Sequence, residues 1–278
     1  MSEAVQVPGP VPAAAAVRWR TSPVVVCGAG AVIGVLGGLI GLGGAEFRLP
    51  LLIGLFGFAA LQAVILNKAM SLIVVITALP ARLLSVSHTD IASHWTIAVN
   101  LLAGSLIGAW LGAGLATRMH SRTLYRVLAG LLIVIAIALA ASHIGHSGTV
   151  ALPPIVRILV AVAAGIGIGV VAALMGVAGG ELLIPTIVLL FAVDIKLAGS
   201  LSLLVSLPTM LVAFARYSRD QSFQVVRGNT RFVLTMAAGS IAGTVLGGLL
   251  LGMFPSLALI PVLVALLVIS AVKVWRHQ

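Results

Sequence analysis

Charged residues are scarce in this chain, and acidic residues are almost absent. Only 8% of the 278 residues are charged, and Asp and Glu together number 6, against 16 Lys and Arg. Hydrophobic residues make up 61% of the chain, and the mean hydropathy is +1.24. Because soluble domains carry about 25% charged residues, this composition excludes a water-soluble fold. It predicts an integral membrane protein that has the lipid bilayer as its solvent.

Cysteine is nearly missing as well, since Cys27 is the single one. One thiol excludes an intrachain disulfide framework and a thiolate metal site. No phosphate-binding loop and no pairing of nucleophile and base stands out, so we expect no catalytic residue, no enzyme activity and no cofactor. His143 and His146 form a His-x-x-His pair, and His88 and His94 lie in another polar stretch. Without further ligands, these are expected to be loop histidines rather than a metal site.

Long polar segments are also missing. The longest is residues 1–22, where Arg18 and Arg20 precede an apolar run. Because no small-x-small cleavage site interrupts that run, we expect an uncleaved first helix behind a cytoplasmic N-terminal segment. A membrane-spanning helix needs roughly 20 apolar residues. Windows that meet this requirement include 24–42, 97–116, 124–141 and 257–274.

An internal repeat divides the chain. Residues 41–50 (GLGGAEFRLP) are matched by residues 176–185 (GVAGGELLIP), and residues 103–112 are matched by residues 238–247. The separation is 135 positions in both cases. Two matches at one separation indicate two homologous halves.

We place the halves at residues 23–143 and 155–274, joined by a loop at 144–154, within one integral membrane domain. Each half has five apolar segments, of which the second is short. In the second half this segment is 182–193, about 18 Å of helix against a hydrocarbon core of about 30 Å. We therefore expect the first two segments to form a hairpin that re-enters the membrane at a Gly-rich turn. In the first half the segments are 24–43, 49–60, 66–86, 95–117 and 123–142.

The basic residues predict the orientation of the halves. Whether the hairpin counts as two crossings or none, each half crosses an odd number of times, so the second half should be inverted. With the N-terminus inside, twelve of the sixteen Lys and Arg residues lie on the cytoplasmic side, which obeys the positive-inside rule. These are Arg18, Arg20, Lys68, Arg118, Arg122, Arg126, Arg216, Arg219, Arg227, Arg231, Lys273 and Arg276.

A rival topology has four crossings per half, with the second and third segments forming one broken helix. It leaves ten basic residues inside and places the short connector with Arg118, Arg122 and Arg126 outside, which disfavours it. We therefore predict an all-α polytopic membrane protein with two inverted helical repeats. It should lie in a bacterial-type inner (plasma) membrane with both termini cytoplasmic. The basic excess indicates this sidedness rather than a nucleic-acid partner, and the sequence is compatible with a homodimer.

The repeated turns carry a family resemblance. The matching residues are Gly41, Gly43, Gly44 and Pro50 in the first half and Gly176, Gly179, Gly180 and Pro185 in the second. With the small residues around Ser71 and Ser200, they make the chain resemble the TauE/SafE sulfite exporter family over nearly its whole length. The resemblance implies a multi-span transporter of sulfite, sulfonates or other sulfur-containing anions. Both turns here carry an acid, Glu46 and Glu181, where the family pattern is more often apolar or glycine.

The turns are also candidate binding elements on physical grounds. A short helix that begins at such a turn presents free N–H groups and its positive dipole end, which suit an oxyanion, and Gly43, Gly44, Gly179 and Gly180 allow close approach.

The charged residues at the turns leave alternatives open. A carboxyl group inside the membrane is costly to ionise, so Glu46 and Glu181 could carry a coupled proton or a gate; the alternative is helix N-terminal capping. Arg48 could pair with Glu46 or bind the anion, or it could be an interfacial, snorkelling arginine.

Polar residues at the start of each third segment are weaker candidates. Asn67, Ser71, Ser200 and Ser202 could donate hydrogen bonds to an oxyanion, although capping or helix–helix bonding is the simpler interpretation. Lys68 and Lys196 are expected to be interfacial anchors. The glycines spaced by four residues are expected to pack helices closely; they are Gly104, Gly108, Gly112, Gly239, Gly243 and Gly247.

Three functions follow from these features. The leading one is a secondary transporter, an exporter of a small sulfur-containing anion, with alternating access between the halves and proton coupling through Glu46 and Glu181. The second is a passive anion channel. The third is a membrane subunit that hands a sulfur compound to another protein.

Overall fold

The computed structural model describes residues 22–40, 44–85, 92–144, 153–250 and 256–276. The N-terminal segment, most of the predicted connecting loop, and Gly41, Gly43, His88 and His146 lie outside these ranges. The described residues form helices and no strand. The helices of the first half are α1 (Pro23–Ile40), α2 (Ala45–Gly54), α3 (Ala60–Ser85), α5 (Trp95–Arg118) and α6 (Ser121–Ile144). Those of the second half are α7 (Pro154–Met175), α8 (Gly180–Phe191), α9 (Ile195–Tyr217), α11 (Thr230–Leu250) and α12 (Ser256–Trp275).

Five of these helices are long and apolar enough to cross a membrane within the described part of the chain. They are parts or all of α3, α5, α7, α9 and α11. The short second helices are also present: α2 has 10 residues and α8 has 12. At 1.5 Å per residue they extend about 15 and 18 Å, roughly half of the hydrocarbon core. α8 follows a turn at the end of α7, with Gly176 and Gly179 in left-handed conformations, as the hairpin prediction requires.

One predicted boundary in the first half is wrong. The apolar run 49–60 was expected to be a single segment, but α2 already ends at Gly54 and α3 begins at Ala60. Gly57, between them, has a φ of 76°, a conformation that a helix cannot continue through. Hydrophobicity does not change across this break, so the apolar pattern gives no sign of it. The second half also contains a connector, η2 (Gln221–Phe223) and α10 (Gln224–Gly228), between α9 and α11.

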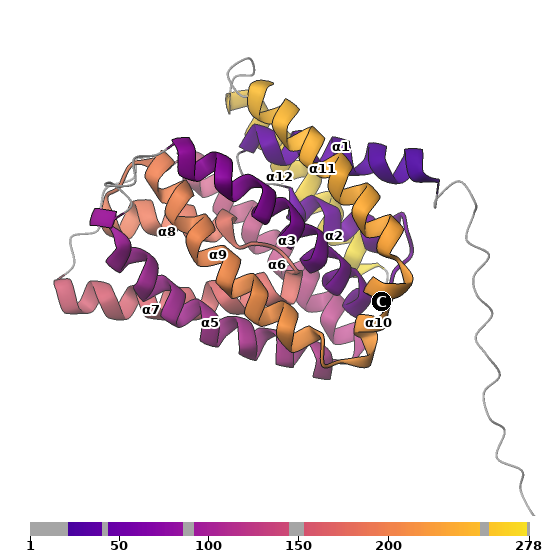
Figure 1. Cartoon of the computed structure of the whole chain (residues 1–278), viewed down its shortest axis with the longest axis horizontal. Coiled ribbons are helices and arrows are strands. Elements are labelled where there is room, and N and C mark those ends of the chain that lie inside the picture. Colours follow the sequence, from indigo (N-terminus) through magenta and orange to yellow (C-terminus); the bar gives the residue numbers. More distant parts are fainter. Residues whose placement is uncertain (1–21, 41–43, 86–91, 145–152, 251–255, 277–278) are drawn as a thin grey trace, which may run out of the picture.

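The glycine stripes pack helices closely, as expected, but each stripe faces a helix of the other half. A Cβ atom added at Gly108 of α5 would overlap the carbonyl oxygen of Ile166 of α7, and one added at Gly243 of α11 would overlap that of Ala31 of α1. Figure 1 shows the two crossed pairs on opposite sides of the bundle, α5 with α7 and α1 with α11. The first helix of each half is therefore packed against the fourth segment of the other.

The packing of the last helices bears on the relation between the halves. α6 and α12 occupy corresponding places in the two halves and pack against each other. The guanidinium of Arg126, near the start of α6, lies 5.8 Å from the ring of Trp275, the last residue of α12. The two helices therefore run antiparallel. Inverted repeats require this antiparallel arrangement, and the inversion of the halves stays a prediction.

Most of the exposed cations gather at one end of the bundle. Arg216, at the end of α9, lies over Trp110 of α5, and the turn after α5 leads directly to Arg126 and Trp275. This end, which we call the basic end, therefore contains the α5–α6 turn, the α9–α11 connector and the end of α12. Its exposed cations are Arg118, Arg122, Arg126, Arg219, Arg227, Arg231, Lys273 and Arg276.

Candidate functional site

The two hairpin turns position the candidate site. Gly44 and Gly179 precede α2 and α8 with φ values of 71° and 84°, a left-handed conformation that glycine adopts without strain. Gly180 is the first residue of α8. Glu46 and Glu181 each lie in the first turn of their short helix. The positive dipole ends of both short helices therefore begin beside these acids.

Asn67 and Lys68 of α3 join the hairpins of the two halves. The Asn67 Nδ2 donates to the carbonyl oxygens of Ala45 and Met175, each at 3.0 Å. The Lys68 Nζ donates to the carbonyl oxygens of Ala172, at 2.8 Å, and Val177, at 2.6 Å. Asn67 thus bonds the start of α2 and the end of α7 at once.

The prediction that Lys68 is an interfacial, cytoplasmic anchor is wrong. Its side chain is fully buried, and its ammonium group binds backbone carbonyls in and after the last turn of α7. These carbonyls lie at the negative end of the α7 dipole, where a cation is stabilising, and the Ala172 carbonyl also accepts from the Val177 N–H at 3.1 Å. The positive-inside rule considers only loops, so it cannot recognise a lysine that caps a helix end inside the protein. The side chain of Lys196 is not among those described.

Glu46 and Glu181 meet where the two halves join. Their carboxyl groups interact with each other, and each also interacts with a cation: Glu46 with Arg48, and Glu181 with Lys68. Glu46 is 1% exposed. Neither oxygen of Glu181 has a hydrogen-bond partner among the described residues, and neither does Oε2 of Glu46. The Glu181 carboxyl therefore lies in the interior beside the start of α8, the Glu46 carboxyl and Lys68.

Arg48 is the most unusual residue of the cluster. Its side chain is 0% exposed, so it does not reach an interface by snorkelling, and that alternative is wrong. Its Nε, Nη1 and Nη2 atoms have no hydrogen-bond partner within the described residues. Buried cations are normally paired or hydrogen-bonded, because their desolvation is costly. The guanidinium is therefore available to a ligand.

The serines differ in their availability. The Ser202 hydroxyl donates to the carbonyl of Gly199, 2.8 Å away in its own helix, which is a structural bond. Ser200 is buried. The Ser71 hydroxyl is buried without a partner among the described residues, and it lies one helical turn beyond Asn67 and Lys68. Ser71 therefore remains a candidate donor on the same face of α3.

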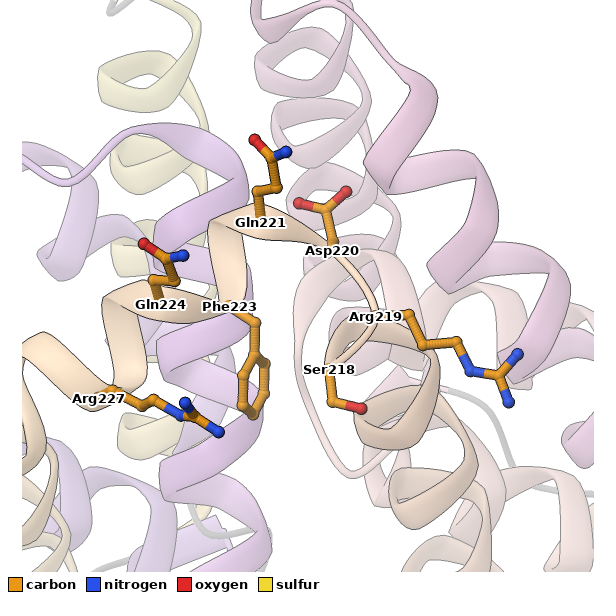
Figure 2. A pocket seen from close by; sticks show the side chains of 7 residues that line it. All are labelled: Ser218, Arg219, Asp220, Gln221, Phe223, Gln224 and Arg227. Carbon is orange, nitrogen blue, oxygen red and sulfur yellow. The ribbon is translucent and has the colours of Figure 1, made fainter.

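The acids of the cluster are repeated in both halves, but its cations are not. Glu46 corresponds to Glu181, but Arg48 corresponds to Leu183, so the first half alone supplies this cation. Lys68 comes from the first half too. Glu46, Arg48 and Lys68 are all buried, so the site is closed in this conformation. A pocket of about 230 Å³ lies instead at the basic end, between α9 and α10, and contains none of the predicted site residues (Figure 2).

The described residues contain no group of three His, Cys, Asp or Glu side chains that could hold a metal ion. What the cluster offers is a different chemistry. Two carboxyl groups can hold or release protons, while a free guanidinium and two helix N-termini can bind an anion. An anion and a proton can therefore occupy adjacent positions in the same closed site.

Comparison with known proteins identifies the family. No curated protein and no solved structure matches the chain. The family model described as Sulfite exporter TauE/SafE matches residues 5–139 and residues 151–278. The two stretches follow the two halves of the bundle and cover nearly all of the chain, which confirms the resemblance seen at the Gly-rich turns. The chain therefore belongs to the TauE/SafE family of multi-pass membrane transporters.

Proposed function

We propose that this protein is a secondary transporter that exports sulfite, an organosulfonate or a related small sulfur-containing anion across the inner membrane. The observation that carries the proposal is the buried Arg48 guanidinium, whose three nitrogen atoms have no partner among the described residues. A planar guanidinium matches two oxygens of a sulfur oxyanion at once, with two parallel hydrogen bonds. The family description supports the choice of substrate.

The surroundings of Arg48 favour the same ligand. Arg48 belongs to α2, close to its N-terminus, and the N-terminus of α8 approaches from the other half through Glu181. Two positive helix ends and the Ser71 hydroxyl would add donors to an oxyanion held by the guanidinium. Because the site is closed, release requires a conformational change that opens it to one side at a time.

We further propose that anion binding is coupled to a proton on the Glu46–Glu181 pair. Two adjacent carboxylates repel each other, and their negative charge also opposes an anion near Arg48. A proton on the pair removes one negative charge. The positive charges of Arg48 and Lys68 then exceed the remaining negative charge of the cluster. The anion and the proton would then bind and cross together, in the direction set by the sum of their gradients, and export would be driven by the outward gradient of the anion itself. The basic end is proposed to face the cytoplasm, with both termini there.

Transport by the purified chain tests the function. Proteoliposomes loaded with sulfite or methanesulfonate should release the anion faster than protein-free vesicles of the same lipid. Release of chloride should not be accelerated to the same degree. If no sulfur anion leaves faster than from protein-free vesicles, the transporter proposal fails; co-purification of a soluble protein would then favour the partner-subunit alternative.

Proton coupling is tested with the double variant Glu46→Gln and Glu181→Gln. In the wild type, an inward proton gradient should drive sulfite accumulation above the external concentration. The amides of the variant cannot take up the proton, so accumulation should fall to the level of vesicles without a gradient, while downhill exchange persists. Transport by the wild type should also decline as the pH rises and the pair loses its proton. Absence of uphill accumulation in the wild type would instead indicate a channel.

A further inference from the structure

A tryptophan at the basic end lies under two arginines. The guanidinium carbon of Arg216 is 5.2 Å from the centre of the Trp110 ring, and that of Arg219 is 5.3 Å from it. Trp110 belongs to α5, while Arg216 is in the last turn of α9 and Arg219 follows that helix. We propose that this Trp110–Arg216–Arg219 group binds the phosphate of an anionic phospholipid, a role that is separate from the transport site.

Both guanidinium groups are available for a phosphate. No described acidic residue forms an ion pair with either of them, and the Nε of Arg216 is buried without a hydrogen-bond partner. The nearest acid in sequence, Asp220, uses its Oδ1 to accept the Ser222 N–H at 2.8 Å. A guanidinium over an aromatic ring is held by the ring face, while its N–H groups point outward in its own plane. Two such groups against one ring could both donate to the oxygens of one phosphate.

The pocket between α9 and α10 is not this site. Figure 2 shows the Arg219 side chain directed away from Phe223 and Arg227, which line the pocket. Arg219 extends instead to the side where it meets Trp110. Arg219 is thus one wall of the pocket, and its guanidinium lies beside Trp110 of α5.

The outer surface of α5 indicates that the ligand is a lipid rather than a free anion. Ile107, Leu111 and Leu115 are 53%, 52% and 47% exposed and follow one another at intervals of four residues, so they form one apolar stripe beside Trp110. Leu211 of α9, also exposed, adds to this surface. An acyl chain could lie along the stripe while its phosphate reaches the arginines. A free phosphate would gain nothing from these side chains.

The position along the bundle agrees with a lipid headgroup. The exposed arginines of the basic end surround the site, and tryptophan is enriched where membranes meet water. A basic surface attracts the anionic lipids of the cytoplasmic leaflet. Trp110 has no counterpart in the second half, since position 245, which corresponds to it, is a valine. The protein would therefore hold this lipid at one place only.

Native mass spectrometry of the purified full chain tests the proposal. After exposure to equal amounts of phosphatidylglycerol and phosphatidylcholine, the wild type should retain phosphatidylglycerol preferentially. The double variant Arg216→Gln and Arg219→Gln should retain about 25-fold less of it, because each basic residue near a membrane contributes about 1 kcal/mol, equivalent to a factor of about five. Arg227→Gln, a neighbouring exposed arginine without an aromatic partner, is the matched control and should retain as much as the wild type.

A second variant separates loss of lipid binding from misfolding. Trp110→Leu preserves the apolar surface but removes the ring that holds both guanidinium groups, so it should also lose phosphatidylglycerol while it elutes as a folded protein. Equal retention by the wild type and both variants would overturn the proposal. So would displacement of the lipid by inorganic phosphate at comparable concentration, which would reveal a site for free anions.

Discussion

Replacement of Arg48 by leucine should abolish anion transport and leave the protein at least as stable as the wild type. Leucine occupies the corresponding position 183 in the other half, where its side chain packs at 1% exposure. Loss of two charge-assisted hydrogen bonds to the anion, worth about 3 kcal/mol together, should slow transport more than about a hundredfold. Substituting an apolar residue for a buried, unpaired charge should be neutral or stabilise the fold by about 1–4 kcal/mol. Vesicle efflux and thermal unfolding in detergent measure the two effects.

Two companion variants make this result specific. Arg48→Lys keeps the charge but not the planar fork, so transport should return in part. Arg231→Leu removes an exposed arginine of the basic end and should change neither quantity strongly. If Arg48→Leu transports as fast as the wild type, the guanidinium does not bind the anion. If it unfolds and Arg48→Lys restores the fold, Arg48 is structural.

Alanine at Gly108 or Gly243 should destabilise the protein strongly. The added methyl group would overlap the backbone of the facing helix, at Ile166 in one case and at Ala31 in the other. Backbone atoms, unlike side chains, cannot relieve the overlap by a change of rotamer. The helices must separate, at a cost of at least about 1–3 kcal/mol at each site. Thermal unfolding should therefore occur at a clearly lower temperature, and the double variant should yield little folded protein in size-exclusion chromatography.

Gly130 and Gly167 provide the matched controls. A Cβ atom at either position meets nothing within 4 Å, although both glycines lie inside helices. Alanine there should be neutral or stabilising, because it is a better helix former than glycine by about 1 kcal/mol. Equal unfolding temperatures for all four variants would mean that the crossed helix pairs are not close-packed in the folded protein.

Much of the fold follows from the sequence. The 135-residue repeat, the short second segments and the basic connector predict the inverted hairpin-bearing halves. The glycine stripes predict close packing, because a helix face without side chains allows any other backbone to approach. That property does not identify the partner helix, so the crossed pairs of α1 with α11 and α5 with α7 could not be foreseen. The break at Gly57 was missed because both sides of it are equally apolar.

The site shows a similar division. Glu46 and Glu181 are predicted from their shared register in two Gly-rich turns, and the structure brings their carboxyl groups together. The role of Lys68 was missed, because its partners are backbone carbonyls of α7, which leave no mark on the sequence around position 68. Arg48 could not be assigned from sequence alone, since burial and the absence of partners among the described residues are properties of the folded chain.

The crossed helix pairs also determine which parts of the molecule can move as rigid units. α1 packs against α11, and α5 packs against α7, through backbone contact. Neither half of the sequence can therefore move as a rigid unit by itself. One body would combine α1, α2 and α3 with α11, and the other would combine α7, α8 and α9 with α5. Their common boundary passes between Glu46 and Glu181. The arrangement is that of a domain-swapped dimer joined into one chain, in which each half lends the other a helix and neither is complete alone.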